Sequence, residues 1–212
     1  MSEVILYDYW RSSASYRVRI ALNLLGIDYT ARPVNLLTAE HKQADYLAIN
    51  PQGILPALRI DGETLTQSLA IIEYLHATRE QSTLLPSDLL GQHRVRQLSY
   101  AVAMEIHPIC NLGVAQYYAE QSGQGDAGKV SWMKHFIAKG LAEFEALLAQ
   151  GDAGAFCLGD APTMADCCLI PQLYNADRWG VDYSAHKRIV RIAERTKMMD
   201  AFDRARPEAV KP

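Results

Sequence analysis

The chain has 212 residues, of which 49% are hydrophobic and 21% charged, and its formal net charge is −3. This composition is typical of a globular protein with one large or two small domains, and the charge balance gives no reason to expect binding to nucleic acid or to a membrane. The first residues contain no basic stretch, and no apolar run approaches the roughly 20 residues that span a bilayer. We therefore expect a cytoplasmic protein.

Cysteine use argues against a disulfide framework and a metal site. Cys110, Cys157, Cys167 and Cys168 include no CxxC pair, and no histidine is placed to complete a zinc site with them. Residues 1–109 contain no cysteine. Thiol redox chemistry therefore cannot come from the N-terminal half of the chain.

The first 80 residues alternate between strand and helix patterns. The predicted elements are a strand over 4–7, a helix from 13 to 25, an extended stretch over 29–35, a short helix over 37–49, a hairpin over 56–65 and a helix over 69–75. Gly26 supplies a left-handed stop for the first helix, and Asp61-Gly62 is a strong hairpin turn signal. Ser68 is positioned to cap the last helix. This order predicts a compact α/β unit.

Two places in this unit suggest ligand binding. Ser12 and Ser13 open a helix directly after a strand, where backbone N–H groups and the helix dipole favour an anion, although a serine there is most often only a cap. We expect a cis bond between Leu55 and Pro56 at the start of a strand. The main chain of Leu55 could then pair with a peptide-like ligand.

The second half of the chain is helical in pattern. After a linker over 80–90, we predict helices over 93–121, 129–150, 165–179 and 186–205. Pro108 should bend the first of them, and Thr163 with Asp166 has the form of a capping box. We therefore expect two domains, an α/β domain over 1–82 and an all-helical domain over 91–212.

Several motifs resemble the zeta class of cytosolic glutathione transferases. Residues 11–22 resemble the class signature, in which Ser-Ser-Cys precedes an aromatic residue and Arg-Val-Arg-Ile-Ala-Leu. Further matches are Asn50-Pro51, Leu55-Pro56 and residues 67–75 and 175–178. The resemblance covers nearly the whole chain. It implies a thioredoxin-like N-terminal domain that binds glutathione, an all-α C-terminal domain that contributes the substrate site, and a homodimer.

The resemblance also implies an activity, the glutathione-dependent cis–trans isomerisation of maleylpyruvate to fumarylpyruvate in gentisate-type degradation of aromatic compounds. A thiolate that adds reversibly to the double bond allows rotation about it, so no metal is needed. The alternatives are maleylacetoacetate isomerisation in tyrosine breakdown, general glutathione conjugation or dehalogenation, and a non-catalytic binding module. Ala14 stands where the family usually holds cysteine, so thiol-exchange side activity should be absent.

The site residues follow from the same resemblance. Ser12 is the leading thiolate partner, with Ser13 as the alternative, and Arg11 and Arg178 are expected to be catalytic clamps for a dianionic substrate. The expected glutathione contacts are Ser12, Ser13, Ser15, Arg17, His41, Leu55, Pro56, Gln67, Ser68, His107 and Asn111. His107 and Asn111 lie four apart on one predicted helix, so both are expected to face the same cleft and to contact substrate as well. Arg19 is expected to be a surface or ion-pair residue.

Overall fold

The computed structural model describes residues 3–212, and its contacts divide the chain into two units. The first unit comprises residues up to Leu85 together with Lys197–Pro212, and the second comprises Pro86–Thr196. This division differs from the expected boundary at one place. The C-terminal residues pack with the N-terminal unit, whereas we expected them in the helical domain.

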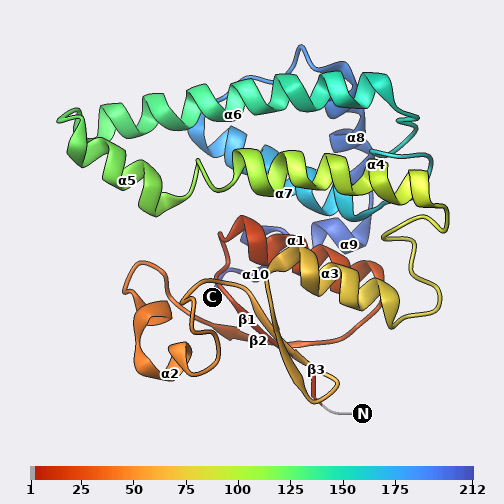
Figure 1. The fold of residues 1–212 in the computed structure, drawn as a ribbon, viewed down its shortest axis with the longest axis horizontal. Helices are drawn as coiled ribbons and strands as arrows, with labels where there is room; N and C mark the ends of the chain where they lie inside the picture. Colours follow the sequence, from red (N-terminus) through yellow and green to blue (C-terminus); the bar gives the residue numbers. More distant parts are fainter. Residues whose placement is uncertain (1–2) are drawn as a thin grey trace. The chain divides into compact units, whose positions relative to one another are not determined.

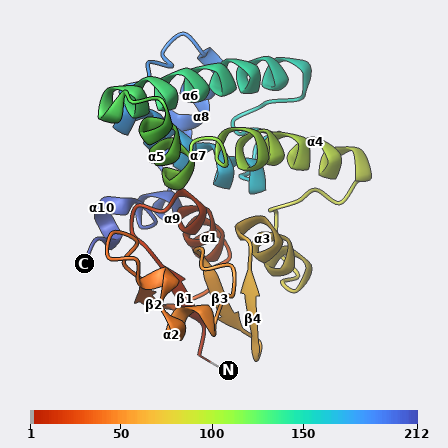
Figure 2. The same ribbon diagram turned by 60° about the vertical axis from the view of Figure 1, so that its left-hand side comes forward.

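The first unit is built on a mixed sheet. Its strands are β1 (Ile5–Asp8), β2 (Thr30–Pro33), β3 (Ala57–Ile60) and β4 (Glu63–Thr66), in the order β2-β1-β3-β4. β1 is parallel to β2 and antiparallel to β3, and β4 pairs antiparallel with β3. Helices α1 (Ser13–Leu24) and α3 (Ser68–Ala77) pack against each other beside this sheet (Figures 1 and 2). The thioredoxin-like prediction is confirmed.

Local signals in the sequence account for much of this unit. Asp61 and Gly62 both have positive φ, at 53° and 86°, as the tight turn between β3 and β4 requires. Gly26, at φ 63°, ends α1 as expected. The helix expected over 37–49 is instead a 3-10 turn (Glu40–Lys42) followed by the short α2 (Ala44–Leu47). Gln43, with ψ 155°, is extended and interrupts it.

The second unit is helical. Its elements are α4 (Leu89–Tyr100), the π-helical segment η2 (Ala101–Ile106), α5 (Leu112–Gln121), α6 (Gly125–Gln150), α7 (Met164–Trp179) and most of α8 (Lys187–Lys197). The short helices α9 (Asp200–Asp203) and α10 (Pro207–Val210) follow and belong to the first unit. Within residues 3–212, no helix is both long and apolar enough to cross a membrane.

The long helix expected over 93–121 is the main error in the predicted elements. The chain leaves α-helical geometry after Tyr100 and passes through η2 before a break that contains Pro108. Proline lacks the N–H that would continue the helical hydrogen bonds. In the π-helical segment before it, each backbone hydrogen bond spans one residue more than in an α-helix. The capping box at the start of α7 is confirmed, since the Asp166 carboxylate accepts the backbone N–H of Thr163 at 2.8 Å and the Thr163 side chain accepts the backbone N–H of Asp166.

Candidate active site

Ser12 lies where β1 leads into α1. It is the N-cap of α1, with φ −67° and ψ 117°, and its Oγ accepts the backbone N–H of Ser15 at 3.2 Å. That bond uses an oxygen lone pair and leaves the hydroxyl hydrogen available to a second partner. Ser13 is the first helical residue, and both serines are half-buried. The capping and functional interpretations of Ser12 are therefore compatible.

The guanidinium of Arg11 is held beside this helix start. Its Nη2 donates to the hydroxyl of Tyr9 at 3.3 Å, and its Cζ lies 4.7 Å from the ring centroid of Trp10. The Nε of Arg11 is buried and has no hydrogen-bond partner within residues 3–212. An unsatisfied buried donor costs roughly 1–3 kcal/mol, so the site favours an additional acceptor near Arg11.

Ser15 and Arg17 lie deeper than expected. Ser15 is fully buried and Arg17 is 3% exposed, so both side chains lie inside the unit. Arg17 Nη1 donates to Ser68 Oγ at 3.3 Å and joins α1 to α3. Ser15 and Arg17 remain proposed glutathione contacts, and their burial leaves little of either side chain exposed to a ligand.

The start of α3 also differs from its prediction. Gln67, with φ 66°, is the N-cap, and Ser68 is the first helical residue, so Ser68 does not cap the helix. The N-cap residue Gln67 makes no side-chain cap bond, so the N–H groups of the first turn of α3 can accept an anion as a partner. Gln67 is exposed and its Nε2 donates to Gln52 Oε1 at 2.9 Å.

The loop before β3 is held by two side chains to which the sequence assigned no contact, although Asn50 belongs to one of the matching motifs. The carbonyl of Ile54 accepts Asn50 Nδ2 at 2.8 Å and the hydroxyl of Tyr46 at 2.7 Å. The next bond, Leu55-Pro56, is cis as predicted. Leu55 packs with Tyr46 in a small apolar cluster. Asparagine before a Pro-Gln-Gly turn is the signal for this structural role of Asn50, because this residue type stabilises its own turn.

His41 borders the same loop. The imidazole is half-buried, and its Nδ1 is buried without a partner among the described residues. Burial, together with the neighbouring Lys42, lowers the pKa of His41. A Cβ at Gly53, whose φ is +58°, would lie 2.8 Å from the carbonyl oxygen of His41, so only glycine permits this approach.

Arg19 is not a surface residue. It is fully buried, and its Nη1 contacts both carboxylate oxygens of Asp8 at 2.7 and 2.9 Å. Nη2 donates to the carbonyl of Trp10 and Nε to that of Ala205, each at 3.0 Å. The ion-pair expectation is confirmed, and the surface expectation is wrong because every donor group of this guanidinium has an acceptor inside the unit.

The remaining predicted site residues lie in the second unit. Arg178 is exposed in the last turn of α7, with its Cζ 5.3 Å from the ring of Trp179. His107 is the C-cap of η2, and Asn111 is the exposed N-cap of α5, where its Oδ1 accepts Gly113 N–H at 3.0 Å. The break at Pro108 separates His107 from Asn111, so they do not share one helical face as expected.

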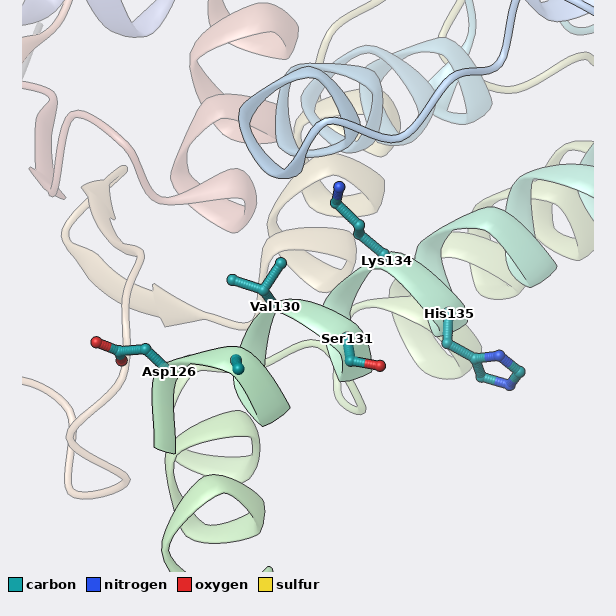
Figure 3. A pocket seen from close by; sticks show the side chains of 6 residues that line it. Asp126, Val130, Ser131, Lys134 and His135 are labelled. Carbon is teal, nitrogen blue, oxygen red and sulfur yellow. The ribbon is translucent and has the colours of Figure 1, made fainter. Parts of the chain in front are cut away.

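A hollow on the second unit lies away from these residues. It is lined by Asp126, Ala127, Val130, Ser131, Lys134 and His135, which all belong to α6 (Figure 3). Figure 3 shows the labelled side chains pointing in different directions along one helix. None of the predicted site residues lines it. The hollow is therefore a groove on the surface of α6 and not the predicted site.

Comparison with known families supports the motif-based assignment. Residues 2–77 match the family model for the glutathione S-transferase N-terminal domain, and residues 136–207 match that for the C-terminal domain. A maleylacetoacetate isomerase of Rhizobium meliloti is 57% identical over 211 residues, covering 100% of this chain and 99% of the relative. The chain belongs to the glutathione S-transferase family.

Solved structures agree with this assignment. A maleylpyruvate isomerase in holo form, described as a bacterial zeta-class glutathione S-transferase, matches with a TM-score of 0.94 at 40% identity over 98% of both chains. A maleylacetoacetate isomerase of Methylobacterium extorquens AM1 with bound malonate and glutathione matches with a TM-score of 0.92 at 38% identity over 98% of both chains. The zeta-class resemblance seen in the motifs is confirmed.

Proposed function

We propose that the protein is a glutathione-dependent cis–trans isomerase of a maleyl keto acid. The observation that carries the proposal is the position of Ser12 at the N-terminus of α1, where its Oγ accepts the Ser15 N–H and so keeps its hydroxyl hydrogen for another acceptor. Arg11 lies directly before it and supplies a positive charge. The isomerase names of the relatives and the glutathione bound in one of the similar structures support the same function.

The residues of the first unit fit glutathione, which presents two carboxylates, an ammonium group and a cysteinyl backbone. The uncapped start of α3 at Gln67 and Ser68 suits the γ-glutamyl carboxylate. The main chain of Leu55 is assigned to the cysteinyl part, and His41, with its unpartnered Nδ1, to the glycyl end. Bound glutathione would supply a thiolate that adds reversibly to the substrate double bond and permits rotation about it.

Ser12 is assigned to the sulfur. A free thiol with a pKa near 8.5 is mostly protonated at neutral pH, and a hydrogen-bond donor beside a helix N-terminus lowers that pKa. Ser12 meets both conditions, because it caps α1 and retains a hydrogen to donate. Ser13 is the alternative donor, since it starts the helix and is also half-buried.

Arginines are assigned to the substrate carboxylates. A maleyl keto acid is a dianion at neutral pH, and the guanidinium fork pairs with a carboxylate through two bonds. Arg11, already oriented by Tyr9, is assigned to one carboxylate, and the exposed Arg178 to the other. His107 and Asn111 remain proposed polar contacts, each on its own element.

The substrate has two candidates. The sequence resemblance led us to expect maleylpyruvate, and the 0.94 TM-score to a maleylpyruvate isomerase supports that choice. The 57% identity to a maleylacetoacetate isomerase exceeds the 40% identity to that structure, so we infer that maleylacetoacetate is the preferred substrate. The keto-acid tail beyond the maleyl group is the part that distinguishes the two.

The test is the loss of the cis keto-acid absorbance for each substrate, with and without glutathione, on one enzyme preparation. We expect glutathione-dependent conversion of both acids, with a higher kcat/KM for maleylacetoacetate. A folded protein that binds immobilised glutathione but converts neither acid would contradict the isomerase proposal and favour conjugation. A folded protein that does not bind glutathione would favour the interpretation that the protein is a non-catalytic binding module.

A further inference from the structure

The C-terminal segment of the chain returns to the helix that carries the proposed thiolate donor. Figures 1 and 2 both show α9 beside α1, with which it is in contact. Asn23 Nδ2 donates to the carbonyl of Ala201 at 2.9 Å, and Arg19 Nε donates to that of Ala205. Phe202 and Ala205 are buried. The segment is thus an integral part of the first unit.

Arg19 connects this segment to the loop before Ser12. The same guanidinium that holds the carbonyl of Ala205 also holds the carbonyl of Trp10, while Asp8 neutralises it. A planar guanidinium with fixed donors sets the relative position of its acceptors. The backbone of Trp10 and the C-terminal segment are therefore placed by one buried group.

The side chain of Trp10 meets two cations. Arg11 Cζ lies 4.7 Å and Lys211 Nζ lies 5.3 Å from the centroid of its ring. Both distances are within the roughly 6 Å over which an indole face attracts a cation. The ring of Trp10 therefore contacts both Arg11, its neighbour in sequence, and Lys211, which lies in the C-terminal segment.

We propose that Lys211 is a positioning residue for Arg11, acting through Trp10, and that it sets the affinity for the dicarboxylate substrate. The inference rests on the proposed role of Arg11 as a carboxylate clamp. Lys211 fixes the orientation of the indole, and the indole, together with Tyr9, fixes the guanidinium. A clamp held in one orientation loses less freedom when it binds, and so binds more tightly.

The experiment measures malonate binding to the glutathione-loaded protein by calorimetry, together with KM and kcat for the isomerase substrates. An exposed cation–π contact is worth a factor of about two to five in an equilibrium constant. Lys211→Met should weaken malonate binding and raise the substrate KM by about this factor, with glutathione affinity and kcat little changed. Lys211→Arg retains the cation and should restore malonate affinity.

A matched control separates positioning from the loss of one positive charge. Arg59 is exposed and pairs with Ile5 at the start of β1, at the opposite end of the strand from Trp10. Arg59→Met removes the same charge and should leave malonate affinity unchanged. An equal loss of affinity in Arg59→Met and Lys211→Met would overturn the proposal, since net charge alone would then explain both.

A double-mutant cycle tests the route through the ring. Trp10→Leu should weaken malonate binding, and Lys211→Met should then add nothing further. Additive effects, or normal malonate binding by Lys211→Met, would overturn the inference while leaving the isomerase proposal intact. A wild-type protein that binds glutathione but neither malonate nor a maleyl keto acid would instead refute the proposed function. Unchanged thermal unfolding midpoints would show that the variants fold.

Discussion

Arg17 Nη1 and Ser68 Oγ, 3.3 Å apart inside the first unit, join the helix that Ser12 caps to the helix that begins at Ser68. The two helix N-termini are the parts of the unit assigned to the sulfur and to the γ-glutamyl carboxylate of glutathione. A single buried hydrogen bond therefore links two proposed ligand contacts, and its removal should affect glutathione binding more than substrate binding.

Arg17→Met is expected to raise the glutathione KM and to lower the free energy of unfolding by about 1–3 kcal/mol, because the buried hydroxyl of Ser68 loses its donor. Urea unfolding and glutathione titration would measure the two effects. Arg17→Lys keeps a cation and should be intermediate. An unchanged glutathione KM in a destabilised Arg17→Met protein would show that the bond serves the fold alone.

Ser12→Ala is expected to lower kcat by roughly tenfold or more, since the bound thiol loses a donor and its pKa rises toward the free value near 8.5. Loss of the α1 cap should also cost about 1 kcal/mol of stability. Thiolate absorbance of the glutathione complex against pH would measure the pKa. Ser12→Asp restores a capping acceptor without a donor hydrogen, so it should recover stability and not turnover.

Ser13→Ala is the matched control for that experiment. Ser13 begins the same helix but does not cap it, so its removal should change the thiol pKa less than Ser12→Ala does. A fully active Ser12→Ala together with an inactive Ser13→Ala would reverse the assignment of the hydroxyl.

The elements that the sequence predicted correctly are those with local causes. Gly26, the Asp61-Gly62 turn and the capping box of Thr163 and Asp166 each act within a few residues, and the structure confirms them. The first turn of α1 was predictable for the same reason, because Ser12 caps it through a bond to Ser15.

The features that the sequence did not predict depend on distant partners. The burial of Arg19 requires the carbonyl of Ala205, which is 186 positions away along the chain. Gln67, with positive φ, is the N-cap of α3 in place of Ser68. The hydroxyl of Ser68 is therefore not used as a cap and accepts a hydrogen bond from Arg17. The spacing of hydrophobic residues also did not predict η2, because that spacing does not distinguish a π-helical turn from an α-helix.

Arg178→Ala is expected to raise the KM of the keto-acid substrate by roughly ten- to a hundredfold, as a charge-assisted hydrogen bond is worth about 1.5–3 kcal/mol. The glutathione KM should be unaffected, because no glutathione contact is assigned to Arg178. Steady-state kinetics with each substrate varied in turn would show the difference. Arg191→Ala removes another exposed arginine of the second unit and serves as the control. A similar rise in the keto-acid KM of the Arg191→Ala variant would argue for a general charge effect.

The native thiols should be unreactive, because burial raises the pKa of Cys110 to about 11 and those of Cys157 and Cys167 well above the ordinary value, and Cys168 is also buried. At about pH 8 a thiol of pKa near 11 is ionised to only about one part in a thousand. The folded protein should therefore react slowly with dithiobis-nitrobenzoate, and the unfolded protein should release all four thiols.

Ala14→Cys places a thiol in the half-buried first turn of α1, where the helix N-terminus lowers its pKa. This variant should show one fast thiol and gain thiol-exchange activity, whereas a fast thiol already present in the native protein would contradict the assignment of its cysteines as buried and inert.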